Sequence, residues 1–147
     1  MNKKSARTLL VLSALVMALV ISPAAVSYPN GIQGVKDSGC NCHGAVTSSE
    51  VVPSITGLPD QYNYSETYEI TVSFVGGPSD PSNINQGGFN LWVSDGELSP
   101  SDATVQSYSV NEVSHTEAGN DQTSWTMTWT SPSSDRNVEF VLHTNSV

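Results

Sequence analysis

The chain has 147 residues, with 14 acidic against five basic residues and a formal charge of −9. Three of the basic residues lie within the first seven positions, so the rest of the chain keeps only Lys36 and Arg136 and has a formal charge of −12 from residue 28 onward. Nucleic acid and anionic lipid both require cationic patches, so we expect no nucleic-acid binding and no direct lipid binding by the mature domain.

Residues 1–27 have the pattern of a secretory signal peptide. A basic start is followed by the uncharged apolar run Leu9–Ile21, then by Pro23 and the small residues Ala25–Ser27. The apolar run is about 13 residues long, whereas a membrane span needs ~20. An uncleaved N-terminal anchor is the alternative. The pattern predicts an extracytoplasmic protein, secreted or on the cell surface, with one mature domain of about 120 residues.

Residues 28–49 form a leader rich in glycine, serine and asparagine, with neither a helical nor a strand period. It contains the stretch "SGCNCHG", which holds both cysteines of the chain and one of its three histidines. We therefore expect an irregular segment that carries a Cys/His cluster.

From residue 50 to the end, apolar and polar residues alternate in short runs. The runs "TYEITVSFV", "GFNLWVS", "SWTMTWT" and "NVEFVLHT" each place apolar side chains on one face, which is typical of half-buried strands. The stretches "GGPSDPSNINQGG", "SDGELSPSD", "EAGNDQ" and "SPSSDRN" have the composition of turns. Strands with one apolar face each need a second sheet to cover them, so we predict an all-β, immunoglobulin-like antiparallel β-sandwich over 50–147. The sequence stops at the end of a predicted strand, and we expect that a final strand or anchor follows it; a natural end on an edge strand is the alternative.

Several separated stretches resemble Reeler (reelin N-terminal-like) domains. They are "GLPDQYNYSETYEITVSF", "GGFNLWVSDGELSP" and "VSHTEAGNDQTSWTMTWTSPSSDRNVEFVLHT". From Ser38 onward the chain is also similar to secreted prokaryotic proteins with a Reeler-like domain, whose leader carries Cys-x-x-Cys-His. The resemblance implies a β-sandwich displayed outside the cell, often followed by a C-terminal membrane anchor. This sequence departs from the pattern in two ways: its motif is Cys-x-Cys-His, one residue shorter, and it stops before the last strand and the anchor, which we expect to follow residue 147.

The Cys/His cluster permits several chemistries. In a c-type-like haem site, Cys40 and Cys42 would form the thioether bonds and His43 would be the proximal ligand, although one intervening residue is short for the two vinyl groups. Two thiolates and an imidazole also suit Zn or Cu. A local disulfide is a third reading, but a bridge from residue i to i+2 is strained and closes a very small loop. The fourth alternative is that the thiols pair with another chain or with a cysteine beyond residue 147, and that His43 only lies nearby.

His115 or His143 would supply the fourth ligand of a Zn or Cu ion, or the second axial ligand of a haem iron. His143 has the opposite parity to Leu142 in its strand, so we expect it to face solvent or the leader and not the core. His115, beside Ser114 and Thr116, reads as part of a polar turn. Trp92 also has outward parity. We expect it to be either an exposed aromatic that binds a partner or a side chain that a loop covers.

These residues predict an exported cell-surface module that binds haem c, or otherwise Zn or Cu, through Cys40, Cys42 and His43, with a redox or electron-transfer role and a redox partner protein. The alternative is a non-catalytic adhesion or structural domain of the envelope that binds a glycan or protein. No catalytic motif is recognisable, so we expect no enzyme activity. The sequence also holds one N-glycosylation sequon, Asn63-Tyr64-Ser65, which agrees with export.

Overall fold

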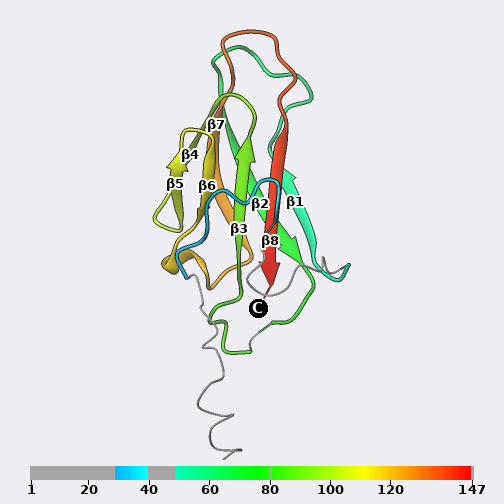
Figure 1. The fold of residues 1–147 in the computed structure, drawn as a ribbon, viewed down its shortest axis with the longest axis vertical. Coiled ribbons are helices and arrows are strands. Elements are labelled where there is room, and N and C mark those ends of the chain that lie inside the picture. Colours follow the sequence, from blue (N-terminus) through cyan, green and yellow to red (C-terminus); the bar gives the residue numbers. More distant parts are fainter. Residues whose placement is uncertain (1–28, 40–48, 80, 147) are drawn as a thin grey trace, which may run out of the picture.

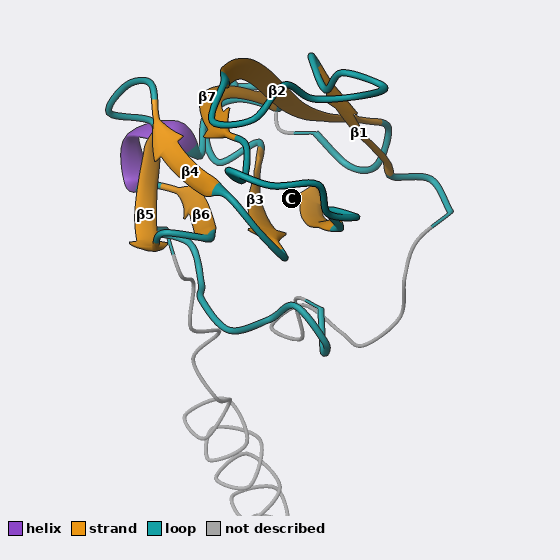
Figure 2. Ribbon diagram, turned by 90° about the horizontal axis from the view of Figure 1, so that it is seen from above, coloured by secondary structure: helices purple, strands orange, loops and turns teal. Residues whose placement is uncertain are grey.

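The computed structural model describes residues 29–39, 49–79 and 81–146. Eight strands form two antiparallel sheets that face one another (Figures 1 and 2). Sheet A has the order β1-β2-β7-β4 and sheet B the order β5-β6-β3-β8. The strands are β1 (Val52–Thr56), β2 (Thr67–Val75), β3 (Gly87–Val93), β4 (Glu97–Pro100), β5 (Val105–Ser109), β6 (Glu112–His115), β7 (Ser124–Thr130) and β8 (Phe140–Ser146). The predicted all-β sandwich is confirmed.

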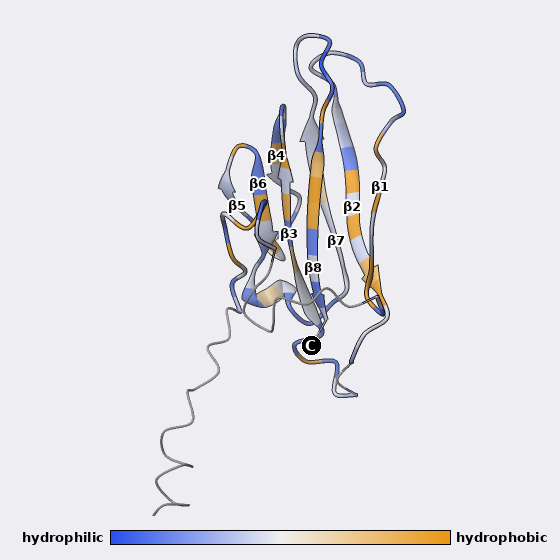
Figure 3. Cartoon of the chain, turned by 45° about the vertical axis from the view of Figure 1, so that its right-hand side comes forward, coloured by the Kyte–Doolittle hydropathy of each residue, from blue (hydrophilic) through white to orange (hydrophobic). Residues whose placement is uncertain are grey.

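Alternation along the strands places the apolar side chains between the sheets. Figure 3 shows polar and apolar bands following one another along β2 and β8. Ile70 and Val72 of β2 and Met127 of β7 are fully buried, and Trp125 and Trp129 are 1% exposed. Each such apolar side chain contributes about 1.5–3 kcal/mol through removal of its surface from water. The inward faces predicted for these strands are therefore correct.

The outer face of sheet A is lined by hydroxyl groups. Thr71 and Thr126 lie within hydrogen-bond distance across β2 and β7, and Thr67 and Thr130 do so near the end of the same pair. Cross-strand hydroxyl pairs and β-branched side chains suit an exposed sheet surface. This face is the polar half of the alternation that the sequence displays.

Two turn predictions are wrong in part. The stretch 94–102 holds β4, whose Leu98 is 2% exposed and enters the core between turns on both sides. His115 is the last residue of β6 and not part of a turn. Both strands have only four residues, and their polar or glycine-rich flanks hide the alternation. The last strand lies close to the predicted run "NVEFVLHT", since β8 covers Phe140–Ser146.

The signal peptide predicted over 1–27 lies outside the described residues. Within the described ranges, no helix has the length and hydropathy that a membrane crossing requires. The one short helix there is a 3-10 turn, Glu117–Gly119.

Candidate functional site

The leader crosses the outer face of sheet B. In Figure 1 residues 29–39 run transversely over β6, β3 and β8. At the β5 end, the side chains of Gln106 and Tyr108 both donate hydrogen bonds to the backbone oxygen of Asn30. In mid-sheet the Asn90 side chain donates to the backbone oxygen of Ile32 at 2.8 Å. The described part of the leader contains turns and no strand or helix, as its composition predicts.

Small residues allow this close approach. Gly31 has φ +69°, and a β-carbon there would collide with Ser114 Oγ. Any other residue would be strained in that backbone conformation and would also push the leader off the sheet. A glycine at position 31 is thus a requirement of the leader's docking.

Trp92 points outward from β3, in agreement with its parity, and Lys36 of the leader covers it. The Lys36 ammonium lies 4.7 Å from the centre of the indole ring, a cation–π contact. A hydrogen bond from Lys36 to Asp37 at 2.7 Å raises the pKa of the ammonium, which therefore stays charged. Because its own leader occupies this ring, Trp92 is not an open platform for a glycan.

His143 lies beneath the end of the described leader. Its Nε2 is 3.1 Å from the backbone oxygen of Lys36. A carbonyl oxygen can only accept, so in this hydrogen bond Nε2 carries the proton, and in the neutral ring Nδ1 carries a lone pair. A β-carbon on Gly39 would lie 3.6 Å from Nδ1, so this nitrogen faces the leader at the residue to which Cys40 is bonded.

Asn90 is the cross-strand neighbour of His143 on the same face of sheet B. It is fully buried, and its Nδ2 donates to the backbone oxygen of Ile32 and to Glu112 Oε1 at 2.8 and 2.9 Å. Its Oδ1 is buried and has no hydrogen-bond partner among the residues that the structure describes. Sequence reasoning missed Asn90, because strand parity places it on an outer face and gives no sign that the leader covers it.

Glu112 fastens the middle of the leader. Its Oε1 accepts hydrogen bonds from the Gly34 backbone nitrogen at 2.7 Å and from Asn90. Burial raises the pKa of the Tyr108 hydroxyl, and the negative charge of Glu112 raises it further. One acidic side chain thereby joins β6, β3 and the leader.

His115 is on β6, on the other side of β3 from His143. Its ring lies at the junction of β6 and β3, where a β-carbon on Gly88 would collide with it and where Ser114 Oγ is 3.4 Å from its Nδ1. Its ring is 6.4 Å from those of Phe89 and Trp125, and its Nδ1 accepts a hydrogen bond from the Phe89 backbone nitrogen at 3.1 Å. The two histidines are thus on strands that β3 separates.

Cys40, Cys42 and His43 lie outside the described residues. Within the ranges 29–39, 49–79 and 81–146, no group of three or more His, Cys, Asp or Glu side chains is arranged to hold a metal ion. The structure thus brings His143 next to the leader, and it separates His143 from His115.

No protein-family model matches this chain, and no curated protein matches it. Among solved structures, the human F-spondin Reeler domain is similar in two crystal structures, with TM-scores of 0.46 and 0.44 and 20% identity in both. The Reelin-N domain of F-spondin is similar with a TM-score of 0.46 and 18% identity. The three alignments cover 64%, 67% and 67% of this chain, and 74%, 78% and 75% of the respective solved chains. These structures are of the domain type that the sequence motifs resemble.

Proposed function

We propose that the protein is an exported module that binds a soft transition metal ion, Zn²⁺ or Cu⁺, through Cys40, Cys42, His43 and His143. The observation that carries the proposal is the position of His143, whose Nδ1 faces the residue that precedes Cys40. Thiolate and imidazole are the ligands that these ions prefer. The motif supplies three ligands, and His143 is the fourth.

The hydrogen bond of His143 supports a ligand role. Metal-binding histidines nearly always donate their second ring N–H to a carbonyl or carboxylate, which fixes the ring and directs the other nitrogen at the ion. The contact of His143 with the Lys36 backbone oxygen has this form. His143 is therefore held with Nδ1 directed toward the leader before any metal binds.

Chain length supports the same arrangement. Cys42 is three residues beyond Gly39 and His43 is four, and a fully extended residue spans at most about 3.6 Å. All three motif ligands are thus within about 15 Å of Gly39 along the chain. The buried Oδ1 of Asn90, on the strand next to His143, is a further polar atom that a metal-bound water would satisfy.

The same residues define the haem reading. Haem c would be held by Cys40, Cys42 and His43, with His143 or His115 as a further ligand. A flat macrocycle at His143 Nδ1 needs more room beside Gly39 than a single ion does. Copper or haem would give the module an electron-transfer role, since zinc has no redox chemistry.

The test uses the mature protein exported by its native host. We expect about one zinc or copper per chain by elemental analysis, no Soret band, and loss of the metal in Cys42→Ser with the fold retained by circular dichroism. His143→Gln should weaken metal binding by at least tenfold, while His115→Gln, the matched control, keeps it.

Other results would overturn the proposal. A Soret band that survives acid–acetone extraction would establish covalent haem. Metal loss in His115→Gln but not in His143→Gln would make His115 the fourth ligand. A metal-free and iron-free protein with a Cys40–Cys42 disulfide would leave the adhesion or structural module of the envelope.

A further inference from the structure

We propose that Asn63 is an N-glycosylation site and that the exposed ring of Tyr64 packs against the first sugar. Asn63-Tyr64-Ser65 is the one Asn-x-Ser/Thr sequence in the chain. All three residues are exposed, and Tyr64 is 59% exposed, among the highest values for large apolar side chains in the described ranges. The proposal rests on export and is independent of the metal site.

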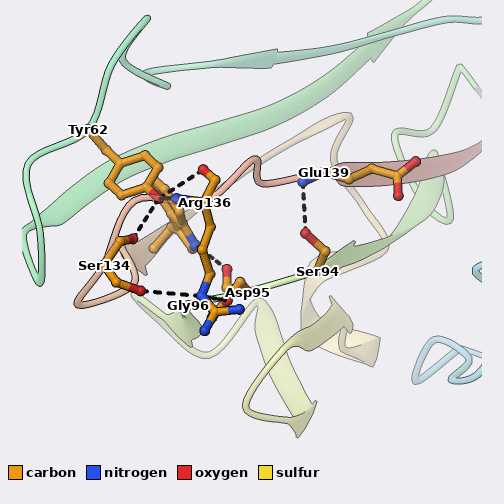
Figure 4. Close-up of polar contacts among 8 residues, drawn as sticks. Tyr62, Ser94, Asp95, Gly96, Ser134, Arg136 and Glu139 are labelled. Carbon is orange, nitrogen blue, oxygen red and sulfur yellow. Dashed lines mark hydrogen bonds and ion pairs between the residues drawn. The ribbon is translucent and has the colours of Figure 1, made fainter.

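The loop between β1 and β2 holds Asn63 in a defined position. Its backbone nitrogen donates to Tyr68 Oη at 2.7 Å, and its backbone oxygen accepts from Ser131 Oγ at 2.6 Å. The neighbouring Tyr62 hydroxyl lies among the backbone atoms of Ser134 and Arg136, as Figure 4 shows. The backbone of the sequon is thus fixed at the end of the sandwich while its side chains point to solvent.

The location leaves room for a bulky group. The loops that contain residues 57–66 and 131–139 lie together at one end of the molecule, beyond the segment where the leader crosses sheet B (Figure 1). A glycan on Asn63 would extend from this end and would not displace the leader.

The modification replaces one bond by another without an oxidant. Asn63 Nδ2 attacks the anomeric carbon of a polyprenyl-phosphate-linked or polyprenyl-diphosphate-linked oligosaccharide. The new N–C bond forms as the C–O bond to the lipid phosphate breaks, the lipid phosphate leaves with that electron pair, and Nδ2 loses one proton. The donor and its membrane-bound transferase come from the exporting cell, and the Ser65 hydroxyl completes the sequence that the transferase recognises.

The side-chain contacts of Asn63 are compatible with the linked form. Nδ2 donates to Glu66 Oε2 at 2.5 Å, and an amide has two N–H bonds, so one remains after glycosylation. Glu66 can therefore orient the glycosidic linkage. Tyr64 is next to this amide and packs edge-on against Tyr62 with ring centres 6.4 Å apart, which leaves one ring face to meet the apolar C–H face of a sugar.

The experiment measures the intact and peptide masses of the protein exported by its native host. We expect a mass increment on the peptide that contains Asn63, and its loss in Asn63→Gln and in Ser65→Gly. Glycine is the matched replacement because Ser65 has φ +55°, a conformation in which alanine would be strained. Tyr64→Ala should keep the increment but abolish the protection against heat that the glycan gives to the wild-type protein.

Two results would refute the site. One is an unmodified Asn63 peptide from the native host, and the other is a mass increment that persists in Asn63→Gln. A glycan that stabilises Tyr64→Ala as much as the wild-type chain would refute the packing on Tyr64. Metal content does not enter any of these measurements, so the two proposals fail separately.

Discussion

Replacement of Asn90 by alanine should release the leader from sheet B without unfolding the sandwich. The change removes two hydrogen bonds of Nδ2, one to the backbone oxygen of Ile32 and one to the Glu112 carboxylate. Only the bond to Ile32 crosses from the sheet to the leader, because Glu112 belongs to β6 and stays next to Asn90 when the leader opens. A neutral hydrogen bond contributes about 0.5–1.5 kcal/mol, so local opening should become easier by about that amount.

Trypsin is a direct reporter of this opening. From residue 28 onward the chain has only two basic residues, Lys36 in the leader and Arg136 in an exposed loop. When opening is rapid, cleavage follows the population of the open form. Cleavage after Lys36 should therefore accelerate by about 2- to 12-fold in Asn90→Ala, since 1.4 kcal/mol corresponds to a factor of ten.

Cleavage after Arg136 is the internal control and should keep its rate. Asn145→Ala is the matched variant. Asn145 is on β8 and faces the same side of sheet B as Asn90, but it makes no hydrogen bond to the described leader residues 29–39. Equal acceleration at both tryptic sites would mean that Asn90 stabilises the whole sandwich. An unchanged rate after Lys36 would mean that its hydrogen bonds do not hold the leader.

Two further predictions concern backbone and charge. Gly57 and Gly34 both have positive φ, but a β-carbon on Gly57 would collide with the Glu69 backbone oxygen, whereas one on Gly34 meets nothing within 4 Å. Gly34→Ala should cost about 1–2 kcal/mol in urea unfolding and Gly57→Ala at least about 2 kcal/mol more; equal costs would contradict the packing of the loop against β2. The side chain and backbone nitrogen of Thr104 both donate to Asp102 and lower the pKa of its carboxyl group below 3.8. The stability from Asp102 is therefore present above pH 3.8 and lost as the pH falls through the folded-state pKa, so Asp102→Asn should flatten the acid side of the stability curve, and an unaltered acid midpoint would count against this contact.

Strand alternation was sufficient to predict the large strands of the sandwich. Ile70, Met127 and Trp129 fall at every second position of their strands, and all three are buried. Alternation needs several residues to be recognised, so β4 and β6, with four residues each, were hidden among turn-forming neighbours. The length of an element limited the prediction more than its composition.

The sequence likewise predicted one part of the candidate site and missed another. Parity predicted that His143 faces solvent or the leader and not the core, because the side-chain direction in a strand follows from its neighbours. The structure places the leader there. Parity could not predict that Asn90 is buried, since the cover comes from a segment 58 positions away in the chain. Ligand roles for Cys40, Cys42, His43 and His115 are neither supported nor excluded by the described residues, and they stay predictions.

The transverse course of the leader fixes an order of detachment. A pull on the chain from the N-terminal side first strains the hydrogen bonds of Asn30 at β5, next those at Glu112 and Asn90, and finally the contact of His143 at β8. The bonds act in series, so tension reaches the last contact only after the earlier ones break. The contact between His143 and the leader is thereby insulated from mechanical disturbance at the amino terminus.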